Sequence, residues 1–87
     1  MRVQVLEERT ELWEASENAE SPDFDAWMVK VSNFIVLRCR GKELANRVWG
    51  AFPGKVSFSR PDLIKDIYRL VIQGVDPEKV QETLQGL

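Results

Sequence analysis

The chain has 87 residues, with 12 Lys and Arg against 14 Asp and Glu, no histidine and a single cysteine. Its length fits one domain, and 44% apolar with 30% charged residues is typical of a folded domain. Without histidine, Ser-His-Asp triads and Cys-His pairs are excluded. Cys39 alone provides neither an intrachain disulfide nor a closed zinc site. We therefore expect a protein that is not an enzyme and that holds no cofactor and no metal.

The spacing of apolar residues in the first segment fits both a helix and a strand. Apolar pairs at positions 5–6 and 12–13 repeat at the seven-residue spacing of a helix, whereas residues 2–5 alternate like a strand. We expect a helix over residues 4–16. Three carboxylates would then line its solvent-facing side at steps of three and four residues, namely Glu7, Glu11 and Glu14.

The stretch from Ser21 to Gly41 has the strongest helical pattern. Ser21 is a suitable N-cap, Pro22 fits the first turn, and Gly41 is a typical stop. This pattern predicts a central helix that is buried among its neighbours. The apolar residues at helical steps are Phe24, Trp27, Met28, Val31, Phe34 and Ile35.

Three more helices are expected after Gly41. The first has apolar residues on one face over residues 44–52 and ends at Pro53-Gly54. The second begins near Ser59 and ends at Gly74, and the third begins at Asp76-Pro77. The sequence thus predicts one all-α domain over residues 1–87, a compact bundle of four to five short helices.

No segment has the character of a targeting or membrane signal. The first residues lack the apolar run of a signal peptide, and the longest apolar runs have four residues, as in Phe34–Leu37. A membrane-spanning helix needs about 20. We expect a cytoplasmic protein that does not enter a membrane.

Charge is segregated along the chain. Residues 1–26 have a net charge of -6, residues 27–60 of +6, and residues 61–87 of -2. Four explanations stay open, one of which is that the segregation has no functional meaning; the other three are as follows. The acidic segment packs on the basic one, the basic segment contacts phosphate, or the carboxylates imitate a nucleic-acid backbone. The candidate partner-binding residues are Arg38, Arg40, Lys42, Arg47, Glu7, Glu11 and Glu14.

Other notable side chains are expected to be structural. The tryptophans Trp13, Trp27 and Trp49 lie at helical spacing beside aliphatic residues, which favours a core position over base stacking. Cys39, on an apolar face, is expected to be a small buried hydrophobic residue.

The function that remains is binding to another protein. We expect a non-catalytic protein–protein interaction module that acts as a small regulator or inhibitor, with a homodimer as a further possibility. The alternative is a helix-turn-helix DNA-binding regulator using residues 60–85. Nucleic acid is the less favoured partner, because the segment Pro77–Gln85 offers one Lys against two Glu.

Overall fold

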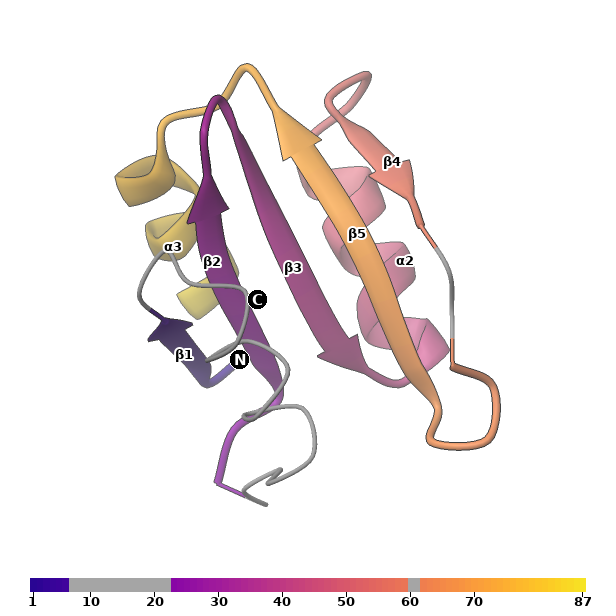
Figure 1. The fold of residues 1–87 in the computed structure, drawn as a ribbon. Coiled ribbons are helices and arrows are strands. Elements are labelled where there is room, and N and C mark those ends of the chain that lie inside the picture. Colours follow the sequence, from indigo (N-terminus) through magenta and orange to yellow (C-terminus); the bar gives the residue numbers. More distant parts are fainter. Residues whose placement is uncertain (7–22, 60–61) are drawn as a thin grey trace.

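The computed structural model describes residues 1–6, 23–59 and 62–87, which form a five-stranded mixed sheet with two helices on one face (Figure 1). The strand order is β1-β2-β3-β5-β4; β1 runs parallel to β2, and the other neighbours are antiparallel. The prediction of an all-α bundle is therefore wrong. The elements are β1 Val3–Leu6, β2 Ala26–Val31, β3 Phe34–Arg40, α2 Lys42–Ala51, β4 Val56–Phe58, β5 Ile67–Gln73 and α3 Pro77–Gln85.

The expected central helix is in fact the hairpin of β2 and β3. Most residues of both strands are buried on either face of the sheet, so their sequence lacks the alternation of a half-exposed strand and imitates a buried helix. The two strands are joined by Ser32 and Asn33, and Val31 pairs with Phe34. Ser32 has φ 54°, the positive value that the first central residue of a type II′ turn requires.

The segment expected to form a helix before Gly74 contains β5. Before this strand the Asp62 carboxylate accepts hydrogen bonds from the backbone N–H groups of Ile64 and Lys65, both at 3.1 Å, which closes a local turn. The described part of this segment, residues 62–85, therefore contains one helix and one strand. The helix-turn-helix prediction is wrong for this segment, because its first helix does not form.

Two other predictions about the first and last elements differ in outcome. Val3–Leu6 is a strand, so the helix predicted over residues 4–16 is wrong where it overlaps β1; the rest of it lies outside the described residues. The last helix is confirmed. Its N-cap Asp76 accepts a hydrogen bond from the Glu78 N–H at 3.0 Å, and Pro77 begins the helix.

The helix predicted over residues 44–52 is also confirmed, as α2. Both helices pack on the same face of the sheet, and their apolar sides complete the main core. From the helices and the C-cap of α2 this core receives Ala45, Val48, Phe52, Val80 and Leu84, and from the strands Ala26, Met28, Ile35, Leu37, Cys39, Leu70 and Ile72. The opposite face, which we call the outer face, has a second buried cluster of Trp27, Val29, Val36 and Ile67.

Candidate partner-binding surfaces

Three arginines lie on the outer face of the sheet. Arg38 and Arg40 alternate along β3 with Leu37 and Cys39, which belong to the helix-side core, so their side chains project from the other face. Arg69 of β5 is the direct register partner of Arg38. Arg69 does not stand out in the sequence, because its position beside Arg38 depends on a strand pairing that the helical prediction did not contain.

These three arginines are themselves partly buried. The Arg40 guanidinium carbon lies 5.3 Å from the centroid of the Trp27 ring, within the range of a cation–π contact. The Nε atom of Arg69 is buried and has no hydrogen-bond partner. Among the described strand residues of the outer face there is no Asp or Glu, so the charge that the strands place there is entirely positive.

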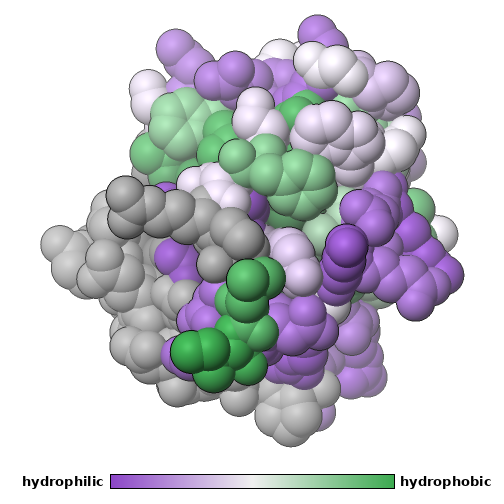
Figure 2. Space-filling view, turned by 90° about the vertical axis from the view of Figure 1, so that its right-hand side faces the viewer, coloured by the Kyte–Doolittle hydropathy of each residue, from purple (hydrophilic) through white to green (hydrophobic). Residues whose placement is uncertain are grey.

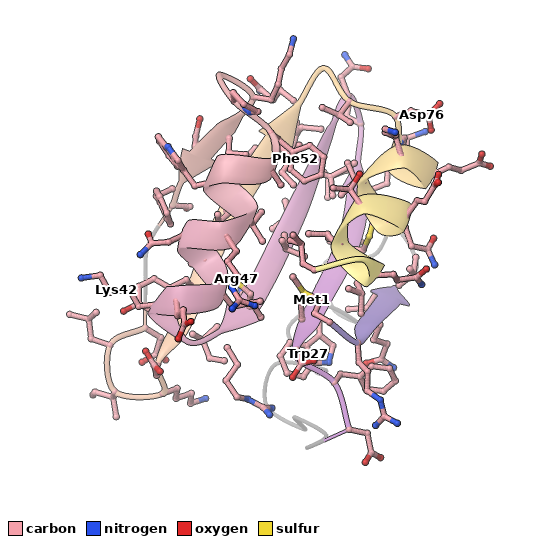
Figure 3. All side chains as sticks on the ribbon, turned by 180° about the vertical axis from the view of Figure 1, so that it is seen from behind. Met1, Trp27, Lys42, Arg47, Phe52 and Asp76 are labelled. Carbon is pink, nitrogen blue, oxygen red and sulfur yellow. The ribbon has the colours of Figure 1, made fainter. Side chains whose placement is uncertain are left out.

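The other two predicted basic residues, Lys42 and Arg47, are on α2, on the helix-covered side of the sheet (Figure 3). Arg47 lies 3.5 Å from the Glu43 carboxylate one turn earlier, an exposed ion pair. Arg40 and Arg47 both line an open hollow of about 360 Å³ beside the start of α2, which neither Arg38 nor Lys42 lines. The predicted basic group is thus divided between two sides of the molecule.

The predicted acidic contact residues, Glu7, Glu11 and Glu14, lie outside the described residues. Their role as a partner surface, or as a cover for the arginines, stays a prediction.

An exposed aromatic pair marks the opposite end of the sheet from β1. Trp49 of α2 and Phe58 of β4 are stacked, with ring centroids 4.9 Å apart and an interplanar angle of 12°. Trp49 is 48% exposed and Phe58 is 45% exposed. The prediction of a core position is therefore wrong for Trp49, whereas it is confirmed for Trp27 at 3% exposure; Trp13 lies outside the described residues.

The backbone of β4, beside this aromatic pair, directs some of its N–H and C=O groups away from the sheet. Lys55 C=O accepts a hydrogen bond from Gln73 N–H at 3.0 Å, and Ser59 N–H donates one to Arg69 C=O at 2.8 Å. In an antiparallel ladder, successive residues direct both backbone groups alternately to one side and then to the other. Ser57, like residues 55 and 59, therefore directs its backbone N–H and C=O groups toward β5.

It follows that Val56 and Phe58 direct their N–H and C=O groups away from the sheet. β4 is the last strand in the sheet order, and no strand in the described parts of the chain pairs with its outer side. Its residues carry no charge and no proline, the usual protections of an edge strand. We call this region, formed by Val56, Ser57, Phe58 and Trp49, the β4 edge surface. Figure 2 views the molecule from this side and shows apolar surface among hydrophilic side chains.

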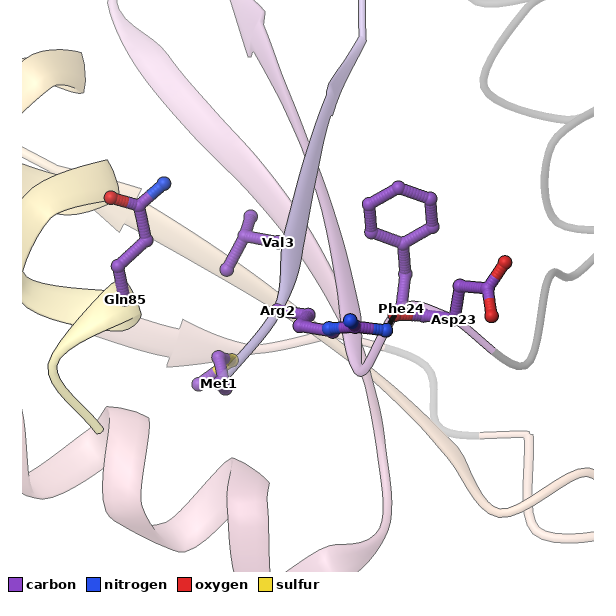
Figure 4. Close-up of a pocket in the computed structure, with 6 residues that line it drawn as sticks. All are labelled: Met1, Arg2, Val3, Asp23, Phe24 and Gln85. Atoms are coloured by element: carbon purple, nitrogen blue, oxygen red, sulfur yellow. Dashed lines mark hydrogen bonds between the residues drawn. The ribbon is translucent and has the colours of Figure 1, made fainter.

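A larger hollow, of about 660 Å³, lies where β1, α3 and the segment before β2 meet (Figure 4). Arg2 makes two hydrogen bonds beside this hollow. The Arg2 side chain donates to the Asp23 carbonyl at 3.2 Å, and the Arg2 N–H donates to the Asp25 carboxylate at 2.9 Å. These bonds attach β1 to the residues that lead into β2. The lining residues are Met1, Arg2, Val3, Asp23, Phe24 and Gln85.

The cysteine is buried, as the sequence predicts. Cys39 has no exposed surface, and its thiol lies 3.7 Å from the Tyr68 carbonyl oxygen. Burial disfavours the thiolate and raises the pKa of Cys39 to about 12. The thiol is therefore protonated at neutral pH, which is the unreactive form.

No protein-family model, curated protein or solved structure matches this chain. In the described residues, no helix is long and apolar enough to cross a membrane. Nor do these residues contain a group of three or more Cys, Asp or Glu side chains placed to hold a metal ion.

Proposed function

We propose that the chain is a non-catalytic protein–protein interaction module whose main contact is the β4 edge surface. This proposal rests on two accessible features that lie together, a set of backbone groups and an aromatic stack. Outward-directed backbone groups of Val56 and Phe58 lie beside the half-exposed stack of Phe58 and Trp49.

Each feature supplies a different part of recognition. An extended segment that adds to a sheet edge gains main-chain hydrogen bonds, which are independent of its sequence. An aromatic pair supplies a large apolar contact of the kind that dominates the binding energy of protein interfaces. Together they favour an extended polypeptide with at least one apolar side chain over a compact polar ligand.

A direct test uses displayed random twelve-residue peptides as the probe. We expect selected peptides to shift the backbone amide resonances of residues 56–58 and to lose affinity for Trp49→Ala. The matched control is Ile64→Ala, because Ile64 is 99% exposed in the turn before β5, outside the β4 edge surface. Removing the Trp49 ring forfeits a contact of about 1 kcal/mol or more, roughly fivefold in affinity. Equal binding by the two variants would overturn the proposal.

We propose a second, electrostatic contact for the same module on the outer face. Arg69 favours an acidic segment of a partner protein, because its Nε has no hydrogen-bond partner and guanidinium groups bind carboxylates in a bidentate manner. The net charge of -2 opposes a long polyanion such as duplex DNA. The positive charge of the outer-face strands is the observation that favours this contact.

The probe for this second contact is a fluorescently labelled ten-residue oligoglutamate, followed by anisotropy at low and high salt. We expect binding that weakens with salt and that is lost in Arg69→Gln. Lys79→Gln is the control, because Lys79 is an exposed cation on α3. Binding that persists in Arg69→Gln would contradict the contact, as would tighter binding to a duplex oligonucleotide than to the peptide.

A further inference from the structure

We propose that the β4 edge surface binds a second copy of this chain, so that two sheets join edge to edge about a two-fold axis through Ser57. This inference rests on the proposed function, because it names the occupant of the same surface. Three observations support it, namely the register of the outward backbone groups, the side chains that this register brings together, and the charge along the edge.

The backbone groups of the edge are self-complementary. The two outward-facing residues, Val56 and Phe58, lie on either side of Ser57. If two copies of β4 run antiparallel with the axis at Ser57, Val56 of one copy lies opposite Phe58 of the other. Both members of that pair direct N–H and C=O toward the partner strand, so each pair exchanges two hydrogen bonds. The two symmetric pairs thus satisfy all the outward groups of β4 in both copies.

The side chains match in the same register. Val56 and Phe58 pair with Ile72 and Leu70 on β5, both of which belong to the helix-side core, so the two β4 side chains lie on the helix side of the sheet. Directly opposed residues of an antiparallel pair share one face. Phe58 of one copy therefore contacts Val56 of the other, and the exposed side of each Trp49–Phe58 stack is covered near the axis.

Charge does not oppose this arrangement. Lys55, the charged residue next to the strand, falls opposite Ser59 of the second copy rather than opposite its own symmetry mate. No like-charged residues are therefore paired across the edge. Such self-complementarity is the requirement of an isologous two-fold interface. The ladder is short, so we expect a weak dimer that depends on concentration.

Ser57 lies on the axis and provides the sharpest test. In this register it faces its own copy as a non-hydrogen-bonded pair, with Cα atoms about 4.5 Å apart, a separation that a disulfide accepts. We expect Ser57→Cys to form a covalent dimer under mild oxidation. Asn33→Cys is the control, because Asn33 is exposed in the turn between β2 and β3. The native Cys39 does not interfere, because it is buried.

A charge exchange at the same position tests the symmetry itself. Sedimentation of Ser57→Lys is expected to show a dimer dissociation constant raised by roughly fivefold, because two like charges then meet at the axis. An equal mixture of Ser57→Lys and Ser57→Glu is expected to recover the association, since opposite charges then face each other. Neither variant is expected to disturb the fold, because Ser57 is exposed.

The outcomes separate this inference from the proposed function. If Ser57→Cys cross-links no more than Asn33→Cys and the chain sediments as a monomer up to about 1 mM, the second copy is wrong as the occupant. In that case displayed peptides that still bind at residues 56–58 leave the proposed function standing. If the peptides also fail to bind there, both proposals are overturned. Preferential cross-linking together with recovery in the mixed sample supports the dimer.

Discussion

Arg38 and Arg69 lie directly opposite one another on β3 and β5, so their two cationic side chains leave the outer face of the sheet side by side. Like charges at such a position destabilise a sheet. The Arg69 Nε atom is, in addition, buried without a hydrogen-bond partner. We expect this pairing to cost the folded chain some stability, and replacement of Arg69 measures that cost.

The first prediction follows from this pair. Replacing Arg69 with Leu keeps most of the apolar stem and removes the repulsion, so the free energy of unfolding is expected to rise by about 0.2–1 kcal/mol at low salt. Urea denaturation at two salt concentrations measures this change. Lys65→Leu, in the exposed turn before β5, serves as the reference. A clear loss of stability in Arg69→Leu would show that the guanidinium is needed by the fold.

The second prediction concerns Cys39 and alkaline pH. The folded chain retains the thiol proton up to a pH near 12, whereas the unfolded chain releases it near 9.0. The native state therefore binds more protons between these values, and the free energy of unfolding falls as pH rises through this interval. The fall attributable to the thiol reaches about 1.4 kcal/mol per pH unit.

The comparison with Cys39→Ala isolates the thiol from the other groups that titrate at alkaline pH. Denaturant unfolding from pH 8 to pH 10.5 is expected to show a steeper loss of stability for the natural chain than for Cys39→Ala. A thiol reagent added at pH 8 is expected to react with Cys39 only at the rate at which the chain opens. Parallel pH profiles for the two proteins would contradict the assignment.

The third prediction contrasts two apolar residues. Leu37 is fully buried in β3, the central strand of the sheet, and Leu37→Ala is expected to lower the free energy of unfolding by about 2–5 kcal/mol. Leu63 is 74% exposed in the turn before β5, and Leu63→Ala is expected to change it by less than about 0.5 kcal/mol. Thermal or urea unfolding measures both. Equal losses for the two variants would show that the core is misplaced.

The fourth prediction concerns the beginning of α3. The Asp76 carboxylate accepts the Glu78 N–H, so Asp76→Ala is expected to destabilise the protein by about 0.5–2 kcal/mol. Asp76→Asn retains an acceptor oxygen and is expected to lose much less. A loss in Asp76→Asn as large as that in Asp76→Ala would mean that the carboxylate charge, rather than the cap hydrogen bond, stabilises this end of the helix.

The sequence identified α2 and α3 because their ends carry local signals. Pro53-Gly54 ends one, Asp76-Pro77 begins the other, and Gly41 and Gly74 precede them with positive φ values. These signals act through backbone and side-chain chemistry within a few residues of each other. They are therefore readable without any knowledge of the fold.

The candidate surfaces were only partly predictable. Arg38 and Arg40 stood out by charge alone, but Arg69 joins them only through the pairing of β3 with β5. The aromatic spacing of Trp49 pointed to the core, yet its ring stacks on Phe58 at the margin of the sheet. The β4 edge surface has no sequence signature. A strand lies at an edge only when no other strand pairs with one of its sides, and this depends on the order of strands in the sheet.

By itself, then, the sequence determined where the two helices begin and end, and that Trp27 and Cys39 would be buried. The tertiary structure decided that β2, β3 and β5 are strands and which side chains they place together. The physical reason is that a short apolar run buried on both faces has no distinctive period. Its choice between helix and strand depends on partners distant in the chain, here the other strands of the sheet.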